Sequence, residues 1–238
     1  METRRKFIKK VGAAAALGLL ADWAMAMPAS DKLGDLLPQR QLIRNGEKVT
    51  AFCLGGYHLG LTDTPSEAQQ MIERSLELGV RFFDNARGYN SGRSEEYMGQ
   101  FLTPKYRDQI FLMTKAPEKS GEGVQKQLED SLKALNTDYL DLWQIHALRD
   151  PKDVDDRINA GVLDVFLEAK EKGLTRYLGF TGHVNPVTHL HFLEFLDKRG
   201  LEFDTCQMPL NVCDPSFESF EEHVLPALLE REYGVIAM

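Results

Sequence analysis

Residues 81–94 read RFFDNARGYNSGRS, and this stretch decides how the rest of the chain is interpreted. Phe82 and Phe83 are typical of a buried strand, whereas Asp84 stands where that strand should reach solvent. The glycines and asparagines that follow predict a loop. Tyr89 lies five residues after Asp84 in that loop. A buried strand whose carboxyl end delivers charge into a loop is a common way to build a functional site.

Similar apolar runs recur along the chain at even intervals. The offsets between the starts of seven such runs are 29, 29, 29, 36, 28 and 31 residues, and the runs begin near Phe52, Arg81, Ile110, Tyr139, Thr175, Phe203 and Gly234. Units of about 30 residues, each a strand and a helix, predict a parallel sheet with helices outside. A doubly wound sheet is the alternative, but no G-x-G-x-x-G follows the first run. The even spacing therefore favours an α/β fold of the (β/α)8 TIM-barrel type.

The elements between the strands show the expected signals. Residues 41–50 read as a hairpin with Asn45-Gly46 as its tight turn. Thr64 and Pro65 are typical of the start of a helix. Comparable helical patterns cover residues 123–135, 161–172, 186–199 and 217–230. In the last of these we expect Phe217, Phe220 and Val224 to pack in the core, and we expect His189 and His191 on the helix before it to lie at the surface.

Seven strands are one fewer than a complete barrel needs. The chain stops at Met238, inside or just after the seventh strand. A barrel without its eighth strand has two unpaired edges, which is a poor state for a soluble protein. We therefore expect residues 27–238 to be a barrel domain truncated at its C-terminus.

Residues 1–26 have the features of an export signal rather than of the barrel. Basic residues are followed by the apolar run VGAAAALGLLA and then by AMA, which is the order of a secretory signal. The pair Arg4-Arg5 is similar to the twin-arginine signal, and a simple secretory signal or an uncleaved amphipathic helix is the alternative. The signal predicts the twin-arginine machinery as a partner, a periplasmic location, and no stable membrane span once the chain is cleaved after Ala26.

Composition narrows the classes of partner. The net charge is −8, and no basic run occurs beyond the first ten residues, which argues against nucleic acid as a partner. Cleavage after Ala26 would remove five positive and two negative charges, giving −8 − 3 = −11. The three cysteines do not indicate a disulfide framework; Cys206 and Cys213 could pair, but Cys206 lies in a predicted buried strand. No cysteine cluster indicates a metal site. A small-molecule substrate is the expected partner.

Chemistry in such barrels sits at the carboxyl ends of the strands. Polar residues at the predicted ends are Tyr57, His58, Asp84, Tyr89, Lys115, His146, Thr181, His183, Gln207 and Asn211. Any one of them alone is more simply explained as a loop cap or a solvated side chain. Asp84, Tyr89, Lys115 and His146 come from three consecutive strands, however, and together they form one convergent set.

This set has a physical logic. A tyrosine hydroxyl is a weak acid at neutral pH, and a nearby ammonium favours its phenolate. A buried lysine in turn needs a carboxylate in order to stay charged. Asp84, Lys115 and Tyr89 can form such a chain, and His146 can orient a substrate carbonyl. The arrangement suits hydride addition to a carbonyl, with Tyr89 protonating the developing alkoxide.

The stretch GVRFFDNARGYNSGRSEEYMG closely resembles the aldo-keto reductase signature, and FLMTK, YLDLWQIH, TRYLGFTGH, FDTCQMPLN and YGVIAM are similar to later strands of that family. The resemblance covers residues 38–238. It implies a (β/α)8 barrel that reduces aldehydes and ketones with NADPH, or NADH, and without a metal. It implies the catalytic tetrad Asp84, Tyr89, Lys115 and His146, and a cofactor site at Gly56, Tyr57, Asp84, Thr181 and Gln207.

Two departures from the family pattern stand out. The usual Asn after the fifth-strand hydroxyl residue is Gly182 here, followed by His183, which removes one expected contact to the nicotinamide carboxamide. The GFTGH and MPLN patterns are similar to a divergent branch, some of whose members carry an iron–sulfur domain further along. The segments that stack on nicotinamide and bind the 2′-phosphate in the family would lie beyond Met238.

Three functions remain open from the sequence. The first is an exported NAD(P)H-dependent carbonyl reductase. The second is a barrel that binds a cofactor or serves a structural role without turnover, or an inactive fragment of a longer reductase. The third is a metal-dependent hydrolase built on Asp84 and His146, although no ligand-spaced cluster of His and Asp supports it.

Overall fold

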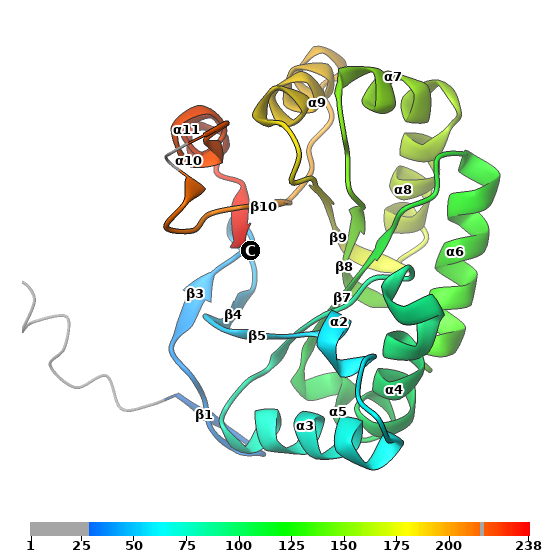
Figure 1. Cartoon of the computed structure of the whole chain (residues 1–238), viewed down its shortest axis with the longest axis vertical. Helices are drawn as coiled ribbons and strands as arrows, with labels where there is room; N and C mark the ends of the chain where they lie inside the picture. The colour runs from blue at the N-terminus through cyan, green and yellow to red at the C-terminus, as the bar shows by residue number, and fades with distance from the viewer. Residues whose placement is uncertain (1–28, 215–216) are drawn as a thin grey trace, which may run out of the picture.

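The computed structural model describes residues 29–214 and 217–238, and its centre is one parallel sheet of seven strands (Figure 1). All seven predicted strands are confirmed, in the spatial order β11-β10-β9-β8-β7-β6-β5. Their bounds are β5 Cys53–Gly55, β6 Phe82–Asp84, β7 Phe111–Ala116, β8 Leu140–Ile145, β9 Thr175–Thr181, β10 Thr205–Met208 and β11 Gly234–Ala237. Each strand therefore pairs with its neighbour in sequence, as expected of successive strand–helix units.

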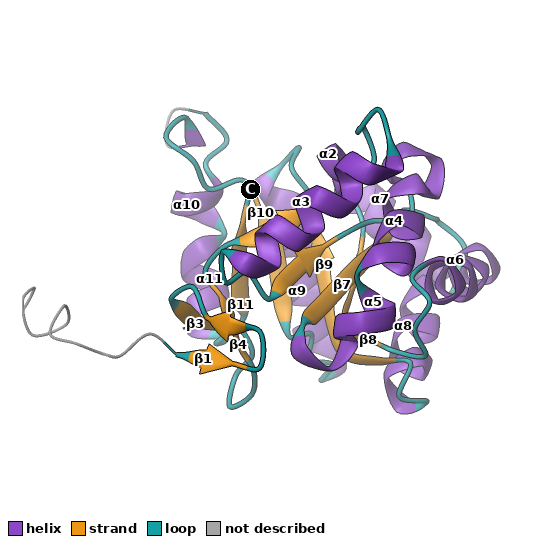
Figure 2. Ribbon diagram, turned by 90° about the horizontal axis from the view of Figure 1, so that it is seen from below, coloured by secondary structure: helices purple, strands orange, loops and turns teal. Residues whose placement is uncertain are grey.

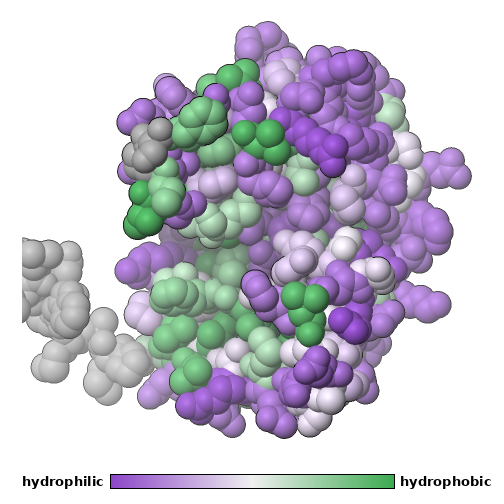
Figure 3. All heavy atoms as spheres, in the orientation of Figure 1, coloured by the Kyte–Doolittle hydropathy of each residue, from purple (hydrophilic) through white to green (hydrophobic). Residues whose placement is uncertain are grey.

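The sheet is an open barrel. Strands β5 and β11 are its two edges, and they do not pair with each other in the part of the chain that is described. In Figure 3, apolar side chains gather on the side where α10, α11 and the β3–β4 hairpin lie in Figure 1. Phe52 before β5 and Leu229 near β11 are 72% and 61% exposed. Over the residues that the structure describes, the predicted α/β barrel with seven strands and no eighth is thus the architecture observed.

Helices surround the outside of the sheet (Figure 2). Several begin with side-chain caps. Thr64 Oγ1, the predicted cap, accepts from the Glu67 N–H at 3.3 Å, and Asn185 Oδ1 accepts from the Val187 N–H at 2.8 Å. The helices are α2 Gly56–Leu59, α3 Pro65–Glu77, α4 Arg93–Phe101, α5 Thr103–Tyr106, α6 Gly121–Ala134, α7 Pro151–Asn159, α8 Val162–Glu171, α9 Pro186–Arg199, α10 Phe220–His223 and α11 Leu225–Glu230.

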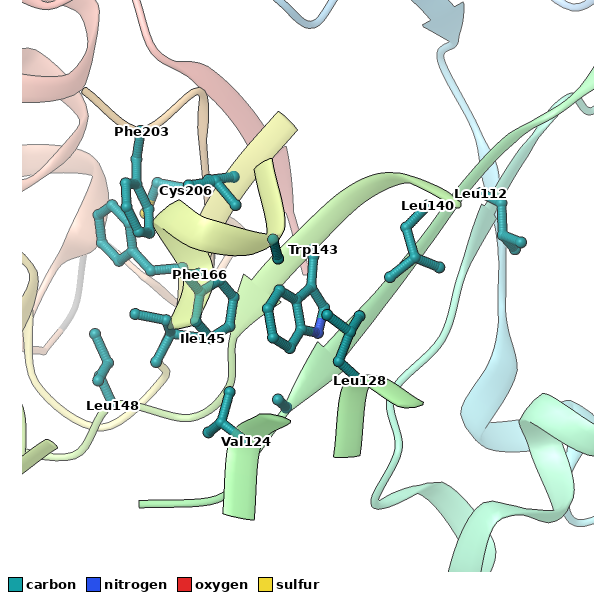
Figure 4. Packing of buried hydrophobic residues seen from close by; sticks show 14 of the residues in the cluster. Leu112, Val124, Leu128, Leu140, Trp143, Ile145, Leu148, Phe166, Phe203 and Cys206 are labelled. Atoms are coloured by element: carbon teal, nitrogen blue, oxygen red, sulfur yellow. The ribbon is translucent and has the colours of Figure 1, made fainter. Parts of the chain in front are cut away.

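The larger core lies between the outer face of the sheet and these helices. Trp143 of β8 stacks on Phe166 of α8 with ring centroids 3.8 Å apart. Val124 and Leu128 of α6 approach the same indole (Figure 4). Because side chains alternate along a strand, this outward packing leaves Leu142 and Gln144 of β8 facing the barrel interior.

A hairpin closes the end of the barrel at which the strands of the sheet begin. Strands β3 (Gln39–Gln41) and β4 (Lys48–Thr50) pair antiparallel. Apolar side chains of the hairpin pack against inward residues of the sheet, in a cluster of Leu42, Ile43, Val49, Phe82, Phe111, Met113, Leu142 and Ile236. The predicted turn was misplaced by one residue: Gly46 N–H donates to Ile43 O at 3.0 Å, so Arg44 and Asn45 are the central pair, with Asn45 at φ 53°.

Three local predictions were wrong. Residues 217–230 do not form one helix, because Pro226 cannot continue a helix that began before it; the chain instead forms α10 and α11. Phe217 is consequently 80% exposed, whereas Phe220 and Val224 are buried as predicted. His189 is fully buried rather than at the surface.

The remaining predictions concern the export signal, membrane spans and the cysteines. The export signal predicted over residues 1–26 lies outside the described residues. Among residues 29–214 and 217–238, no helix has the length and apolar character that crossing a bilayer requires. Cys53, Cys206 and Cys213 are free thiols, and Cys206 is buried as predicted.

Candidate active site

The strand ends bring the predicted residues together in the upper interior of the barrel. Asp84 ends β6, and Lys115 lies near the end of β7, two residues after the Met113 that pairs with Asp84. Both side chains therefore point to the same side of the sheet as Phe82 and Met113 of the lower interior cluster. The inward side chains of β6 and β7 are thus apolar toward the amino ends of the strands and charged at the carboxyl ends.

Lys115 is the centre of the site. Its side chain is 1% exposed and forms a salt bridge with Asp84. Its Nζ also donates to Asn85 O at 2.8 Å and to Tyr89 Oη at 3.3 Å. Burial lowers the pKa of Lys115, but the Asp84 carboxylate and the Tyr89 hydroxyl together more than compensate, so the pKa lies above its ordinary value. Lys115 is therefore a fixed positive charge beside the Tyr89 hydroxyl.

Tyr89 lies in a tight turn, Tyr89–Gly92, directly after the loop from β6. Its ring is between two others: the Tyr57 ring is 5.5 Å away and nearly perpendicular, and the His146 ring is 5.7 Å away at 80°. The Lys115 Nζ lies 5.0 Å from the centre of the Tyr89 ring. The position of the phenol is thus set by three neighbours: Tyr57 on α2, Lys115 on β7 and His146 just after β8.

His146 follows β8 and is held by its backbone, since its N–H donates to Ala116 O at 3.0 Å. Burial, and next the positive charge of Lys115, lower the pKa of His146 to about 3. The imidazole is consequently neutral at physiological pH. In the described residues its Nδ1 is buried and has no hydrogen-bond partner. A neutral imidazole beside a phenol can donate one hydrogen bond without adding a second charge to the site.

Gln207 and Thr181 complete the site from the strands β10 and β9. They are paired in register on β10 and β9, and both are buried. Gln207 Nε2 donates to Asp84 Oδ2 at 2.9 Å, which links β10 to the Lys115 cluster. Gln207 Oε1 is buried and has no hydrogen-bond partner among the residues described. A buried acceptor without a donor is unfavourable, so this oxygen is suited to receive an N–H from a bound molecule.

The backbone around Gly182 explains one departure of the sequence from the family pattern. A Cβ atom at Gly182 would lie 2.6 Å from Leu148 O and 2.8 Å from His189 Cε1. His189 therefore fills the space that a side chain at position 182 would need. His183, next in the chain, is exposed.

Gly56 and Tyr57 begin α2 above the site. A Cβ atom at Gly56 would meet Ser94 Oγ at 2.6 Å and the Asn85 side chain at 2.8 Å, so only glycine fits there without movement. Tyr57 is 50% exposed and turns its ring toward Tyr89.

Not every predicted rim residue joins the cluster. The His58 ring lies against Tyr57, 5.4 Å between centroids, and Asn211 caps its own loop by accepting from the Cys213 N–H. The sequence prediction missed Asn85, whose carbonyl accepts from Lys115. The strand pattern pointed only to side chains, and a backbone acceptor leaves no trace in residue type.

No group of three or more His, Cys, Asp or Glu side chains that could hold a metal ion occurs in the described segments. The chemistry-bearing groups instead form one chain: Gln207, Asp84, Lys115 and Tyr89, with His146 beside the phenol. An open parallel α/β barrel with its polar cluster at the strand carboxyl ends is the class that this fold and site define.

Comparison with known proteins places the chain within that class. Residues 51–238 match the model of the aldo/keto reductase family, so the chain belongs to that family of oxidoreductases. It is 28% identical over 211 residues to the uncharacterized oxidoreductase YqkF of Bacillus subtilis, an alignment covering 84% of this chain and 63% of that protein. It is 31% identical over 159 residues to 6-dehydroglucose reductase of Novosphingobium aromaticivorans, covering 59% and 50% respectively.

Solved structures of aldo-keto reductases have the same fold as this chain. The holo form of the aldo-keto reductase AKR11C1 from Bacillus halodurans superposes with a TM-score of 0.71 at 25% identity, covering 84% of this chain and 65% of that one. The chain thus spans less than two thirds of the length of several of the proteins it matches. Members of the family typically depend on NAD(P)H.

Proposed function

We propose that this protein reduces an aldehyde or ketone to the alcohol, with NADPH, or alternatively NADH, as the hydride donor. The observation that carries the proposal is the buried Asp84–Lys115 pair in hydrogen-bond contact with the Tyr89 hydroxyl. A neutral His146 lies beside that phenol, with the two ring centroids 5.7 Å apart.

Each residue has a distinct part in this proposal. His146, with its proton on Nε2, donates a hydrogen bond to the substrate carbonyl oxygen and polarises it. As a hydride reaches the carbonyl carbon, Tyr89 gives its hydroxyl proton to the oxygen. The charge of Lys115 stabilises the phenolate that remains, and Asp84 keeps Lys115 protonated in a buried site. Solvent then returns the proton to Tyr89.

The residues present fit the nicotinamide group. The unpartnered Gln207 Oε1 offers a buried acceptor for a carboxamide N–H, and Thr181 lies beside it in register. Gly56 and Tyr57 would border the cofactor from above. When bound, the nicotinamide supplies the hydride, and the groups named here bind, orient and move the proton.

Two relatives give context for the substrate class. One is named 6-dehydroglucose reductase, and another, 33% identical over 147 residues, is the methylglyoxal reductase DkgA of Yersinia pestis. Both names describe reduction, which supports a carbonyl substrate for this protein without choosing one.

The test is Tyr89→Phe in the purified protein, assayed for NADPH oxidation against a panel of small aldehydes and ketones. We expect turnover to fall by about 10²-fold to 10⁴-fold, because the variant lacks the proton donor, while NADPH binding is retained. Tyr97→Phe, a half-buried tyrosine on α4, is the matched control and should keep its rate. Wild-type turnover in Tyr89→Phe would exclude the proposed mechanism, and a protein that binds NADPH but reduces no carbonyl would favour a non-catalytic role.

A further inference from the structure

The backbone directly after Tyr89 is unusual. Asn90 has φ 51° and ψ 41°, and Ser91 has φ 57° and ψ 33°, so two consecutive residues with side chains adopt the left-handed conformation. Gly92 follows at φ 92°. The left-handed conformation is sterically unfavourable for each residue that is not glycine. Such a turn persists only where its surroundings hold it in place.

The surroundings in this case are backbone carbonyls of α2 and of Gly60, which caps its C-terminus. Asn90 Nδ2 donates to Tyr57 O at 2.8 Å. Two further side chains from the same segment make similar contacts: Arg93 Nε donates to Gly60 O at 2.7 Å, and Ser94 Oγ donates to Gly56 O at 2.6 Å. We call these three hydrogen bonds the α2 clamp. The clamp ties the turn after Tyr89 and the start of α4 to α2 and its cap, more than thirty residues away in sequence.

Asn90 occupies the critical place in the clamp. Its amide lies so close to Gly60 that a Cβ atom there would collide with it. Its bond is to the carbonyl of Tyr57, and the Tyr57 ring packs edge to face against Tyr89 at 5.5 Å. The residue that follows the proposed proton donor thus also holds the aromatic ring that borders it.

We propose that Asn90 is a positioning residue. Its left-handed backbone and the hydrogen bond from its side-chain amide to Tyr57 O together fix the Tyr57 ring against Tyr89 and so hold the Tyr89 hydroxyl near Lys115. This inference rests on the proposed role of Tyr89 as proton donor. A misplacement of about 1 Å in a reacting group can lower a rate by about 10²-fold, so a residue that only orients the phenol can still control turnover.

The simpler explanation is that Asn90 merely tolerates the left-handed turn, as asparagine often does. The two explanations predict opposite effects of the substitution Asn90→Gly. If conformation alone matters, Asn90→Gly relieves the strain and should be neutral or stabilising. If the hydrogen bond from the Asn90 side chain matters, the same substitution removes it and Tyr57 is no longer held.

The experiment compares Asn90→Gly with Ser91→Gly. Ser91 is exposed and shares the left-handed conformation, so its change to glycine relaxes the turn and leaves the α2 clamp intact. A third variant, Asn90→Asp, keeps the size of the side chain and tolerates the left-handed conformation, but its carboxylate cannot donate to Tyr57 O. For each protein we would measure kcat, the Kd of NADPH, and the ¹⁹F NMR spectrum after labelling with 3-fluorotyrosine.

We expect Asn90→Gly and Asn90→Asp to lower kcat by roughly tenfold to hundredfold with little change in the Kd of NADPH. We also expect them to shift the ¹⁹F resonances of Tyr57 and Tyr89, assigned from the single Phe variants. Ser91→Gly should leave all three readouts as in the wild type. Unshifted resonances in Asn90→Gly, shifted resonances with wild-type kcat, or an equal loss in Ser91→Gly would each overturn the proposal.

The two proposals can fail separately. If the wild-type protein reduces no carbonyl, the proposed function fails. The ¹⁹F spectra then decide alone whether Asn90 positions the two rings, with shifted Tyr57 and Tyr89 resonances supporting it and unchanged ones contradicting it.

Discussion

A lysine enclosed in a protein interior is stable only with a counter-charge, and Lys115 shows how closely stability and the site are linked. Its side chain is 1% exposed and that of Asp84 is 9% exposed. Asp84 in turn accepts from Gln207. Removing one member of such a pair leaves the other charge buried without a partner, which is more damaging than removing both.

We therefore expect Lys115→Met to lower the free energy of unfolding by about 3–5 kcal/mol. The double variant Lys115→Met, Asp84→Asn should be less destabilised than Lys115→Met, because the amide introduced in place of the carboxylate is neutral and can still accept from Gln207. Urea unfolding measures both. Lys126→Met, which breaks an exposed pair with Asp130, is the control and should change the unfolding midpoint little. A double variant as unstable as the single one would show that the unpaired charge is not the cause.

At the scale of elements, Gly99, the last residue of the stretch GVRFFDNARGYNSGRSEEYMG, shows why a glycine belongs at that position. This glycine lies on α4 where the helix crosses α6, and a Cβ atom there would collide with Ala134 O and come within 3.0 Å of the Leu135 carbonyl carbon. Thr103, just after α4, donates to Leu135 O at 2.6 Å. The close crossing of the two helices thus depends on the missing side chain.

Gly99→Ala should consequently destabilise the protein by roughly 1–3 kcal/mol through overpacking, although alanine favours a helix by about 1 kcal/mol over glycine. Gln100→Ala, one residue later and exposed on the same helix, has no such contact and should be within about 0.5 kcal/mol of the wild type. Thermal or urea unfolding of the three proteins checks this. A Gly99→Ala protein as stable as the wild type would mean that the helices separate freely at this crossing.

Elements also show where sequence reasoning ends. Strand runs such as 110–116 and 139–146 were predictable, because buried parallel strands are apolar almost throughout. Helix α9 was predicted at its observed bounds, Pro186–Arg199, but its buried side was not. Apolar residues lie on more than one side of it, so periodicity could not show that His189 faces Phe180 and Phe220.

For the whole molecule, the even spacing of the strands predicted both the order of the sheet and the residues at its rim. Asp84, Tyr89 and Lys115 were predicted to meet and do so. Their roles in catalysis stay predictions. What the sequence could not supply was the loop geometry: the left-handed turn after Tyr89 depends on carbonyls of a distant segment, which no local propensity encodes.

The balance of protonation over the whole chain gives a further prediction. Burial lowers the pKa of His189 to about 4. Burial is also the largest of the causes that lower the pKa of His146 to about 3. Histidine in an unfolded chain has a pKa of about 6.5. Between about pH 6.5 and 4 the unfolded chain therefore binds protons that the native protein does not. Stability should be fully present above that range and be lost as the pH falls.

His189→Leu isolates this effect because the imidazole is fully buried among aromatic rings. The wild type should lose up to about 3 kcal/mol through His189 alone on approaching pH 4, and the variant should lose correspondingly less. Glu95, whose pKa is raised by burial, acts in the opposite direction in both proteins and cancels in the comparison. Urea unfolding at about pH 7.5 and about pH 5 measures the difference. Thr188→Val, a buried change on the same helix, should lower stability equally at both values; the same pH dependence in His189→Leu as in the wild type would contradict the assignment.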